Sequence, residues 1–382
     1  MKILFASTVF PHARDVIRGT YNRELTAALA TGHDVRVVAP VGWADAIRTL
    51  DRRTPDDAEG LAIARPAFWY LPRVRPRSLG RRLVAAMRRG TRRIGHAWTP
   101  ELVLSYWLYP DAWAAQRLAD DFGARHLTIV GGSDVLKLPH EAERGTLVRE
   151  VLGRCDLAVA VSQQLVDAIA AVSPETPAAV WSQGIRTSVL HDGPQIDARG
   201  RLGLPDVPTY LWVGRMVPVK ALPRLIDAFA AVAAAQPCQL VMVGNGPSQE
   251  PTERLVAERG LTDRVRFVGP VAPADLGDYY RACDATVLSS DSEGLPNVLR
   301  ESLACGRPFA SSLVGGVGEI GHDDCRTLAP PGDAAGLAEA MRRVLDPKYR
   351  QAAAARPVRT WQIAASDLVD LAGLAATPLT VP

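Results

Sequence analysis

Cysteine is scarce in this chain. The five cysteines among 382 residues form no Cys-x-x-Cys pair and no zinc-type spacing. A dispersed set of odd number predicts buried free thiols in a reducing compartment. Long apolar runs are also lacking, because the run over residues 1–10 soon meets polar residues and falls short of the ~20 apolar residues of a membrane span. It shows no signal-peptide cleavage pattern either, so we expect a cytoplasmic protein.

Signatures of several enzyme classes are missing as well. The sequence has no Walker A motif, no Gly-x-Ser-x-Gly elbow, no Asp-x-Asp and no His/Cys/Asp cluster with metal-ligand spacing. We therefore expect no metal and no other cofactor. The formal net charge of +3 is too small to predict a nucleic-acid partner. Lysine is rare among the basic residues and occurs at four positions only: Lys2, Lys137, Lys220 and Lys348.

Acidic residues are absent from residues 61–100, which hold ten arginines. The part 81–98 has helical spacing, with an apolar face and an arginine-rich face, and the aromatic cluster Phe68-Trp69-Tyr70 precedes it. Such a segment, over about 65–98, can lie on an anionic membrane at the inner face of the cell membrane. The alternative is a solvated surface helix that packs on its own domain.

Short apolar runs alternate with helical patterns along the chain, and 47% of the residues are hydrophobic. The expected strands cover 2–7, 34–40, 102–107, 126–132 and 157–162, and then 209–215, 239–246, 265–271, 285–290 and 308–312. Helical patterns between them predict parallel α/β sheets covered on both faces. The segment 186–207 is rich in Gly, Pro and Asp, so we expect it to link two doubly wound, Rossmann-like domains over 1–185 and 208–360.

Two carboxylates stand eight residues apart in the segment DSEGLPNVLRES, residues 291–302. This segment follows an expected strand and opens a helix. Glu301, on that helix, is suited to accept hydrogen bonds from a diol such as a ribose, and Glu293 precedes the turn, where a sugar would lie. The alternative is that Glu301 is a surface helix residue and Glu293 an ordinary loop acid.

The turn between these acids suits a phosphate. Pro296 is favourable in the first turn of a helix. The backbone N–H groups of Leu295, Asn297 and Val298 would then lie at the positive helix end, which binds anions.

Two cations follow another expected strand in WVGRMVPVKAL, residues 212–222. Arg215 and Lys220 at the carboxyl edge of a parallel sheet could neutralise a diphosphate. They could equally be two surface cations. Gly19 lies at the first strand-to-helix junction, where its backbone could approach a phosphate or form an ordinary turn.

Together these stretches resemble the retaining GT-B glycosyltransferases of family 4 (glycosyl transferases group 1). The similar segments are SSDSEGLPNVLRESLACGRPFASSLVGGVGEI, WVGRMVPVKAL, VMVGNGP, RVRFVGPV and FPHARDVIRGTYNRELTAALATGHDVRVVAP. The resemblance implies two domains facing across a cleft, with the acceptor on the first and a nucleotide-sugar on the second. It also implies that residues 361–382 form a helix that returns to the first domain.

The resemblance further implies the role of each site residue. Arg215 and Lys220 would hold the diphosphate, with backbone around Gly19 and the N–H groups of the turn before Glu301. Glu301 would bind the ribose, the loop around Val271 would face the base, and Glu293 would contact the donor sugar. No metal would be needed, since the two cations and the helix end replace it.

The chain departs from the family pattern at several positions. Gly131 stands where the family usually has a histidine beside the donor sugar, and Ala221 replaces the glycine that normally follows the lysine. Gln183 and Arg186 occupy the polar positions of the segment that joins the domains.

The acceptor and the activity each leave alternatives open. A lipid-linked saccharide in cell-surface polysaccharide synthesis and a soluble small molecule are both compatible with the sequence. The chain could also be a nucleotide-sugar epimerase or a catalytically decayed protein that still binds nucleotide-sugars.

Overall fold

The chain divides into two compact α/β units. The structure is a computed structural model that describes residues 1–13, 15, 18–48, 60–70, 76–95 and 97–374. The first unit contains Met1–Gly184 and Trp361–Pro382, and the second contains Ile185–Thr360. Parts of the arginine-rich segment, of the loop before Gly19 and of the C-terminal segment lie outside the described residues.

The first unit is built on a parallel sheet of order β4-β2-β1-β6-β7-β8-β9. Its strands are β1 (Lys2–Ala6), β2 (Asp34–Val38), β4 (Ala62–Ala64), β6 (Leu102–Tyr106), β7 (Arg125–Val130), β8 (Leu157–Ala160) and β9 (Ala178–Val180). A separate two-stranded sheet joins β3 (Val41–Gly42) to β5 (Ala67–Phe68). The helices are α1 (Thr20–Ala30), α2 (Trp43–Arg48), α3 (Pro76–Ile94), the π-turn η2 (Leu108–Ala112), α4 (Trp113–Phe122), α5 (Ser133–Leu136), η3 (Leu138–His140), α6 (Ala142–Leu152), α7 (Gln163–Val172) and α15 (Trp361–Leu374).

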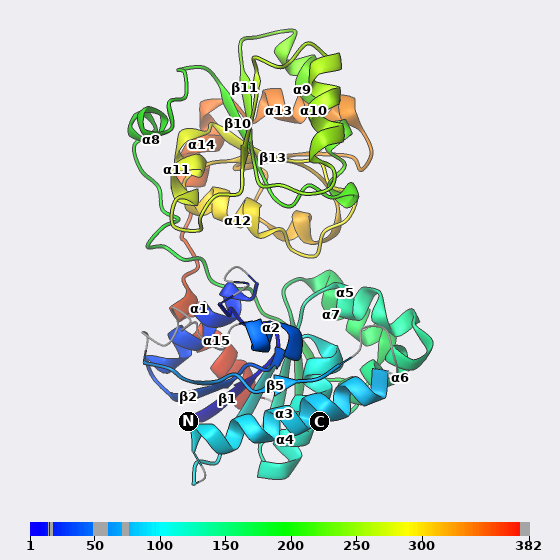
Figure 1. Cartoon of the computed structure of the whole chain (residues 1–382). Helices are drawn as coiled ribbons and strands as arrows, with labels where there is room; N and C mark the ends of the chain where they lie inside the picture. Colours follow the sequence, from blue (N-terminus) through cyan, green and yellow to red (C-terminus); the bar gives the residue numbers. More distant parts are fainter. Residues whose placement is uncertain (14, 16–17, 49–59, 71–75, 96, 375–382) are drawn as a thin grey trace, which may run out of the picture. The chain divides into compact units, whose positions relative to one another are not determined.

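Helices cover both faces of this sheet. Along β1, Leu4 packs in one hydrophobic cluster with α3 and α4, and Ile3 packs in another with α1 and α15. This alternation follows from the two-residue period of a strand buried on both sides. Figure 1 shows α15 beside α1. The Trp181 indole donates to the Ala364 carbonyl of α15 at 2.8 Å, so the C-terminal helix is part of the core of the first unit.

The second unit has a parallel sheet of order β12-β11-β10-β13-β14-β15. Its strands are β10 (Thr209–Val213), β11 (Gln239–Val243), β12 (Val265–Gly269), β13 (Ala285–Leu288), β14 (Phe309–Ser312) and β15 (Arg326–Ala329). Its helices are α8 (Gln195–Leu202), η4 (Pro218–Lys220), α9 (Leu222–Ala233), α10 (Gln249–Glu258), α11 (Leu276–Ala282), α12 (Asn297–Ala304), η5 (Gly315–Glu319), α13 (Ala334–Arg343) and α14 (Pro347–Ala354). The predicted fold class, two doubly wound parallel sheets, is confirmed.

The segment 186–207 differs from the linker that its composition predicts. It belongs to the second unit, and its helix α8 packs on α11. Arg199 is buried and forms ion pairs with Asp206 at 2.5 Å and Asp284 at 2.8 Å. These contacts fix the segment on its domain, although its Gly and Pro content hides the helix in the sequence.

The arginine-rich helix α3 packs on its own unit. Leu83 and Met87 on its apolar face are fully buried, while Arg89 and Arg92 are exposed. The apolar face is therefore occupied by the protein core, as the solvated-helix interpretation expects. None of the helices in the described ranges combines the length and apolar character needed to cross a membrane.

Candidate functional site: the carboxyl edge of the second sheet

The winding of the second sheet reverses between β10 and β13, which are neighbours although they are far apart in the sequence. In open α/β sheets, ligands bind beyond the carboxyl ends of the strands at such a point. Arg215 follows β10, and the segment 289–293 follows β13. Local topology therefore places the two predicted stretches at the same edge of the sheet.

Two of the predicted residues meet there. The Lys220 ammonium lies 2.6 Å from Glu293 Oε1, and the Ser290 hydroxyl donates to the same oxygen at 2.5 Å. The Lys220 side chain is 21% exposed and the Glu293 side chain 11% exposed. These two charges neutralise each other in a largely buried pair.

Backbone contacts hold the loops that carry this pair. The Ser289 hydroxyl donates to the Lys220 carbonyl at 2.8 Å, and the Asp291 N–H donates to the Val219 carbonyl at 2.9 Å. Arg224 pairs with Asp291 at 2.8 Å and also donates to the Ser289 carbonyl. The positions of the ammonium and the carboxylate are thus set by a network between the two loops.

Ala221, which stands where the family usually has glycine, has the backbone conformation of a glycine. Its backbone is left-handed, with φ 47° and ψ 47°, as the chain turns from η4 into α9. This conformation favours glycine, since a Cβ costs about 1 kcal/mol there. Alanine is therefore held at a position that a glycine would occupy without strain.

The helix α12 begins at Asn297, and Pro296 is its N-cap. The sequence predicts that Pro296 lies inside the first turn, whereas the structure places it one residue before the helix. Leu295 and Val298 pack partly buried in an apolar cluster with Leu299, which fixes this end of the helix. The Leu299 N–H donates to the carbonyl of the N-cap residue Pro296 at 3.2 Å. The Asn297 side chain accepts from Arg300 at 3.1 Å.

Glu301 lies one turn further along α12 and contacts a residue that the sequence analysis missed. The Tyr280 hydroxyl donates to Glu301 Oε2 at 2.7 Å. Burial raises the pKa of the Glu301 carboxyl, while this hydrogen bond and the charges of Arg300 and Arg186 act in the opposite direction. The pKa of Tyr280 is raised well above its ordinary value, chiefly by burial. The carboxyl group is therefore oriented by a phenol.

The loop around Val271 lies close to Tyr280, the partner of Glu301. Val271 packs partly buried in the apolar cluster that contains Tyr280. Arg186 donates to the Pro273 carbonyl at 2.9 Å, and its charge also acts on Glu301. Arg186 thus ties the predicted base-facing loop to the start of the second unit.

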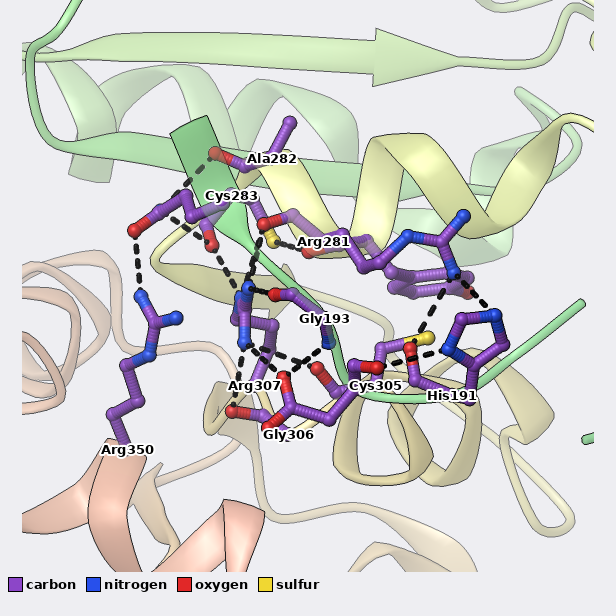
Figure 2. Close-up of polar contacts among 12 residues, drawn as sticks. His191, Gly193, Arg281, Ala282, Cys283, Cys305, Gly306, Arg307 and Arg350 are labelled. Atoms are coloured by element: carbon purple, nitrogen blue, oxygen red, sulfur yellow. Dashed lines mark hydrogen bonds and ion pairs between the residues drawn. The ribbon is translucent and has the colours of Figure 1, made fainter. Parts of the chain in front are cut away.

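A fully buried guanidinium anchors the far end of α12 (Figure 2). Arg307 donates to the carbonyls of Arg281 at 2.7 Å, Cys283 at 3.0 Å and Cys305 at 3.1 Å, and it pairs with Asp192 at 3.0 Å. Because buried charges are stable only when their donors are satisfied, this network fixes α12 relative to α11. It thereby holds the helix that carries Glu301.

The remaining predicted residues are Arg215 and Gly19. Arg215 is exposed, and its guanidinium forms no hydrogen bond or ion pair with any residue that the structure describes. Gly19 belongs to the first unit, where it has φ 78° and caps α1. A Cβ at Gly19 would lie 2.5 Å from the Val9 carbonyl oxygen, so glycine is required for this close approach. No group of three or more His, Cys, Asp or Glu side chains in the described ranges could hold a metal ion.

The two doubly wound units have the GT-B fold, and solved structures share it. Sucrose-phosphate synthase from Thermosynechococcus elongatus superposes with a TM-score of 0.79 over 98% of this chain and 99% of its own, at 24% identity. Anabaena Alr3699/HepE in complex with UDP superposes with a TM-score of 0.76 over 98% and 100%, at 18% identity.

Residues 207–347 match the family model described as Glycosyl transferases group 1. The match covers most of the second unit and confirms, over these residues, the resemblance seen in the sequence.

Curated relatives match over different lengths. D-inositol 3-phosphate glycosyltransferase from Acidothermus cellulolyticus is 34% identical over 53% of this chain and 50% of its own. The chain thus spans about half the length of the relatives of this kind that it matches. The putative teichuronic acid biosynthesis glycosyltransferase TuaC from Bacillus subtilis is 27% identical over 90% of this chain and 89% of its own.

Proposed function

We propose that this protein transfers a sugar from a nucleotide-diphosphate-sugar to a hydroxyl acceptor, with retention of anomeric configuration. The observation that carries the proposal is the Lys220–Glu293 pair at the switch point of the second sheet. Arg215, which pairs with none of the described residues, follows the adjacent strand. A cation and an acid held together at this edge suit a ligand that has both phosphate charge and sugar hydroxyls.

Diphosphate binding falls to Arg215, Lys220 and the first turn of α12. As the bond from the anomeric carbon to the diphosphate oxygen lengthens, negative charge grows on the leaving group. The cations stabilise this charge more strongly in the transition state than in the ground state. Lys220 exchanges Glu293 for phosphate oxygens, and Glu293 turns to the donor-sugar hydroxyls. Metal independence is part of the proposal, because these positive groups serve as the counter-charge.

The nucleoside binds further along the same edge. Glu301, oriented by Tyr280, accepts hydrogen bonds from the ribose hydroxyls, and the loop around Val271 faces the base. The acceptor hydroxyl attacks from the face that the diphosphate leaves, and the diphosphate takes its proton. No protein nucleophile takes part.

The acceptor we propose is a lipid-linked saccharide in cell-surface polysaccharide synthesis. The match to TuaC over 90% of this chain supports this choice, since the name of that protein refers to teichuronic acid biosynthesis. A soluble acceptor is the second candidate, supported by the relatives named for D-inositol 3-phosphate. Turnover with lipid-linked and with soluble acceptors distinguishes the two.

Peripheral contact with an anionic membrane at the inner face of the cell membrane accompanies the first choice. The Trp43 and Trp69 rings stack at 5.5 Å, Trp69 is 48% exposed, and the Arg82 guanidinium lies 5.6 Å from the Trp69 ring. Aromatic rings beside arginines suit the headgroup region of an anionic bilayer.

Liposome co-sedimentation tests this contact. On α3, the side chains of Arg88, Arg89, Arg92 and Arg93 are all exposed, and Arg88 is held by an ion pair with Asp121 at 2.6 Å. We expect the triple variant R89S/R92S/R93S to lose binding to phosphatidylglycerol liposomes and R88S to lose much less. Equal sedimentation of the triple variant and the wild type would rule the contact out.

The experiment for the enzymatic proposal is donor binding and slow donor hydrolysis over a panel of UDP-, GDP- and dTDP-sugars. We expect one preferred donor, bound by the wild type and lost in Glu301→Ala. An epimerase would instead convert the donor to its isomer without an acceptor. A decayed protein would bind a donor and never turn it over, and the absence of any binding would refute the proposal.

A further inference from the structure

The sheet of the first unit also has a switch point, and its carboxyl edge carries an unusual tryptophan. The order of the strands reverses between the neighbours β1 and β6. Trp107 directly follows β6, with φ 81° and ψ 120°. A positive φ is rare for a bulky residue and is retained only where the surroundings enforce it. The position of this side chain is therefore determined by its neighbours.

Hydrogen bonds fix the backbone around Trp107. Its N–H donates to the Ile129 carbonyl at 3.0 Å, and its carbonyl accepts from the Ala112 N–H at 3.0 Å. The fully buried Asp134 accepts from the N–H groups of Leu108 at 3.0 Å and Gly131 at 3.0 Å. One carboxylate thus joins the loop that carries Trp107 to the loop that follows β7.

The indole lies directly against Gly131. A Cβ at Gly131 would be 2.7 Å from the Trp107 ring and 2.8 Å from the Tyr106 hydroxyl, so no side chain fits there. A Cβ at the next residue, Gly132, would meet only Leu165, at 4.0 Å. The loop after β7 is therefore open at Gly132, and the indole next to Gly131 is packed on one side and keeps part of its surface exposed to solvent.

The Trp107 indole is half-buried, and its N–H donates to none of the described residues. This nitrogen is not among the buried polar atoms that lack a partner, so it is accessible to solvent. The indoles of Trp98, Trp113 and Trp181, by contrast, donate to Asp34, Glu150 and Ala364. Trp107 therefore offers both ring surface and a free donor.

From this arrangement, and on the basis of the proposed function, we infer that Trp107 is a stacking platform for a pyranose ring of the saccharide substrate. The negative face of an aromatic ring attracts the positively polarised C–H groups on one side of a pyranose. The indole N–H then donates to a ring hydroxyl. Tyr106, whose hydroxyl lies beside Gly131, and Tyr21, whose ring lies 5.0 Å from that of Tyr106, support the platform.

Saccharide binding without nucleotide tests the inference separately from donor binding. The probes are methyl glycosides of glucose, galactose and mannose, followed by saturation-transfer NMR. We expect the wild type to bind at least one glycoside, Trp107→Gly to bind it at least tenfold more weakly, and Trp107→Phe to lie between them. Binding of UDP and UDP-glucose, measured by calorimetry, should change less than twofold in each variant.

Trp107→Gly is chosen as the test variant because glycine adopts φ 81° without strain, so this variant should still fold. Trp107→Ala loses the same ring but keeps the strained backbone, so it should unfold at a lower temperature than Trp107→Gly. Equal glycoside binding by wild type and Trp107→Gly, or no glycoside binding by the wild type, would overturn the platform. If the wild type bound a glycoside but not UDP-glucose, the donor proposal would be wrong. The comparison of glycoside binding between wild type and Trp107→Gly would still decide the role of Trp107.

Discussion

Replacing Lys220 by methionine removes the ammonium that neutralises the Glu293 carboxylate and leaves that carboxylate with the Ser290 hydroxyl as its nearest donor. At 2.6 Å the gross attraction of the pair is roughly 6 kcal/mol at an effective dielectric constant of 20. Desolvation cancels part of this attraction. Loss of one partner costs about 3–5 kcal/mol in fully buried pairs and about 0–1 kcal/mol in exposed ones. The side chains are 21% and 11% exposed, so we expect about 2–3 kcal/mol.

The opposite single variant should be milder. Glu293→Gln leaves the Lys220 ammonium unpaired, but the flexible lysine stem can carry its charge to water. We expect a cost of about 1 kcal/mol, and a double variant K220M/E293Q that is close to the wild type in stability. In calorimetric unfolding, Lys220→Met should lower the transition by about 5–10 °C, and the double variant should recover most of this.

Activity should follow a different pattern. Lys220→Met removes a charge that faces the departing diphosphate, so turnover should fall at least ~100-fold. The double variant should regain stability but not activity, because the ammonium is still missing. A wild-type unfolding temperature for Lys220→Met would refute the stability estimate. Restored turnover in the double variant would show that Lys220 acts only by neutralising Glu293.

Three further variants and one treatment test other predicted residues and the proposed metal independence. The raised pKa of Glu301 means that the folded state holds this proton more tightly, so stability is lost as pH rises above 4.5. Glu301→Gln should therefore unfold at a higher temperature than the wild type at pH 7 and at a similar temperature at pH 4. Ala221→Gly should stabilise by about 0.5–1 kcal/mol by relieving φ 47°, and Gly19→Ala should destabilise by about 1–3 kcal/mol, both read from urea midpoints. Dialysis against EDTA should leave turnover unchanged, and loss restored by Mg²⁺ or Mn²⁺ would refute metal independence.

Most strands could be predicted because they are runs of apolar residues buried on both faces. The strands β4 and β9 were missed because three residues give no periodicity, and β15 was missed because two of its four residues, Arg326 and Thr327, are polar. Composition also failed over α8, where ion pairs of Arg199 hold a helix that Gly and Pro obscure.

Within the candidate site, sequence order placed Arg215, Lys220 and Glu293 after strands, and topology brought two of them into contact. Direct pairing of Lys220 with Glu293 depends on side-chain conformations that spacing does not encode. Tyr280 was missed because it lies in a helix twenty-one residues before Glu301 and resembles any buried aromatic residue. The positive φ of Trp107 has no signature in the sequence, although its neighbour Gly131 was recognised as a departure.

The two switch points differ in chemistry, and this difference predicts different responses to salt. The second sheet presents the exposed Arg215 and the paired Lys220, whereas the first presents Trp107 and two glycines. Screening shortens the range of electrostatic attraction from about 10 Å at 0.1 M salt to about 3 Å at 1 M, and it does not weaken ring stacking. UDP-glucose should therefore bind several-fold more weakly in 1 M than in 0.1 M potassium chloride, while methyl glycoside binding stays constant. The reverse pattern would mean that charge recognises the saccharide and that neither assignment holds.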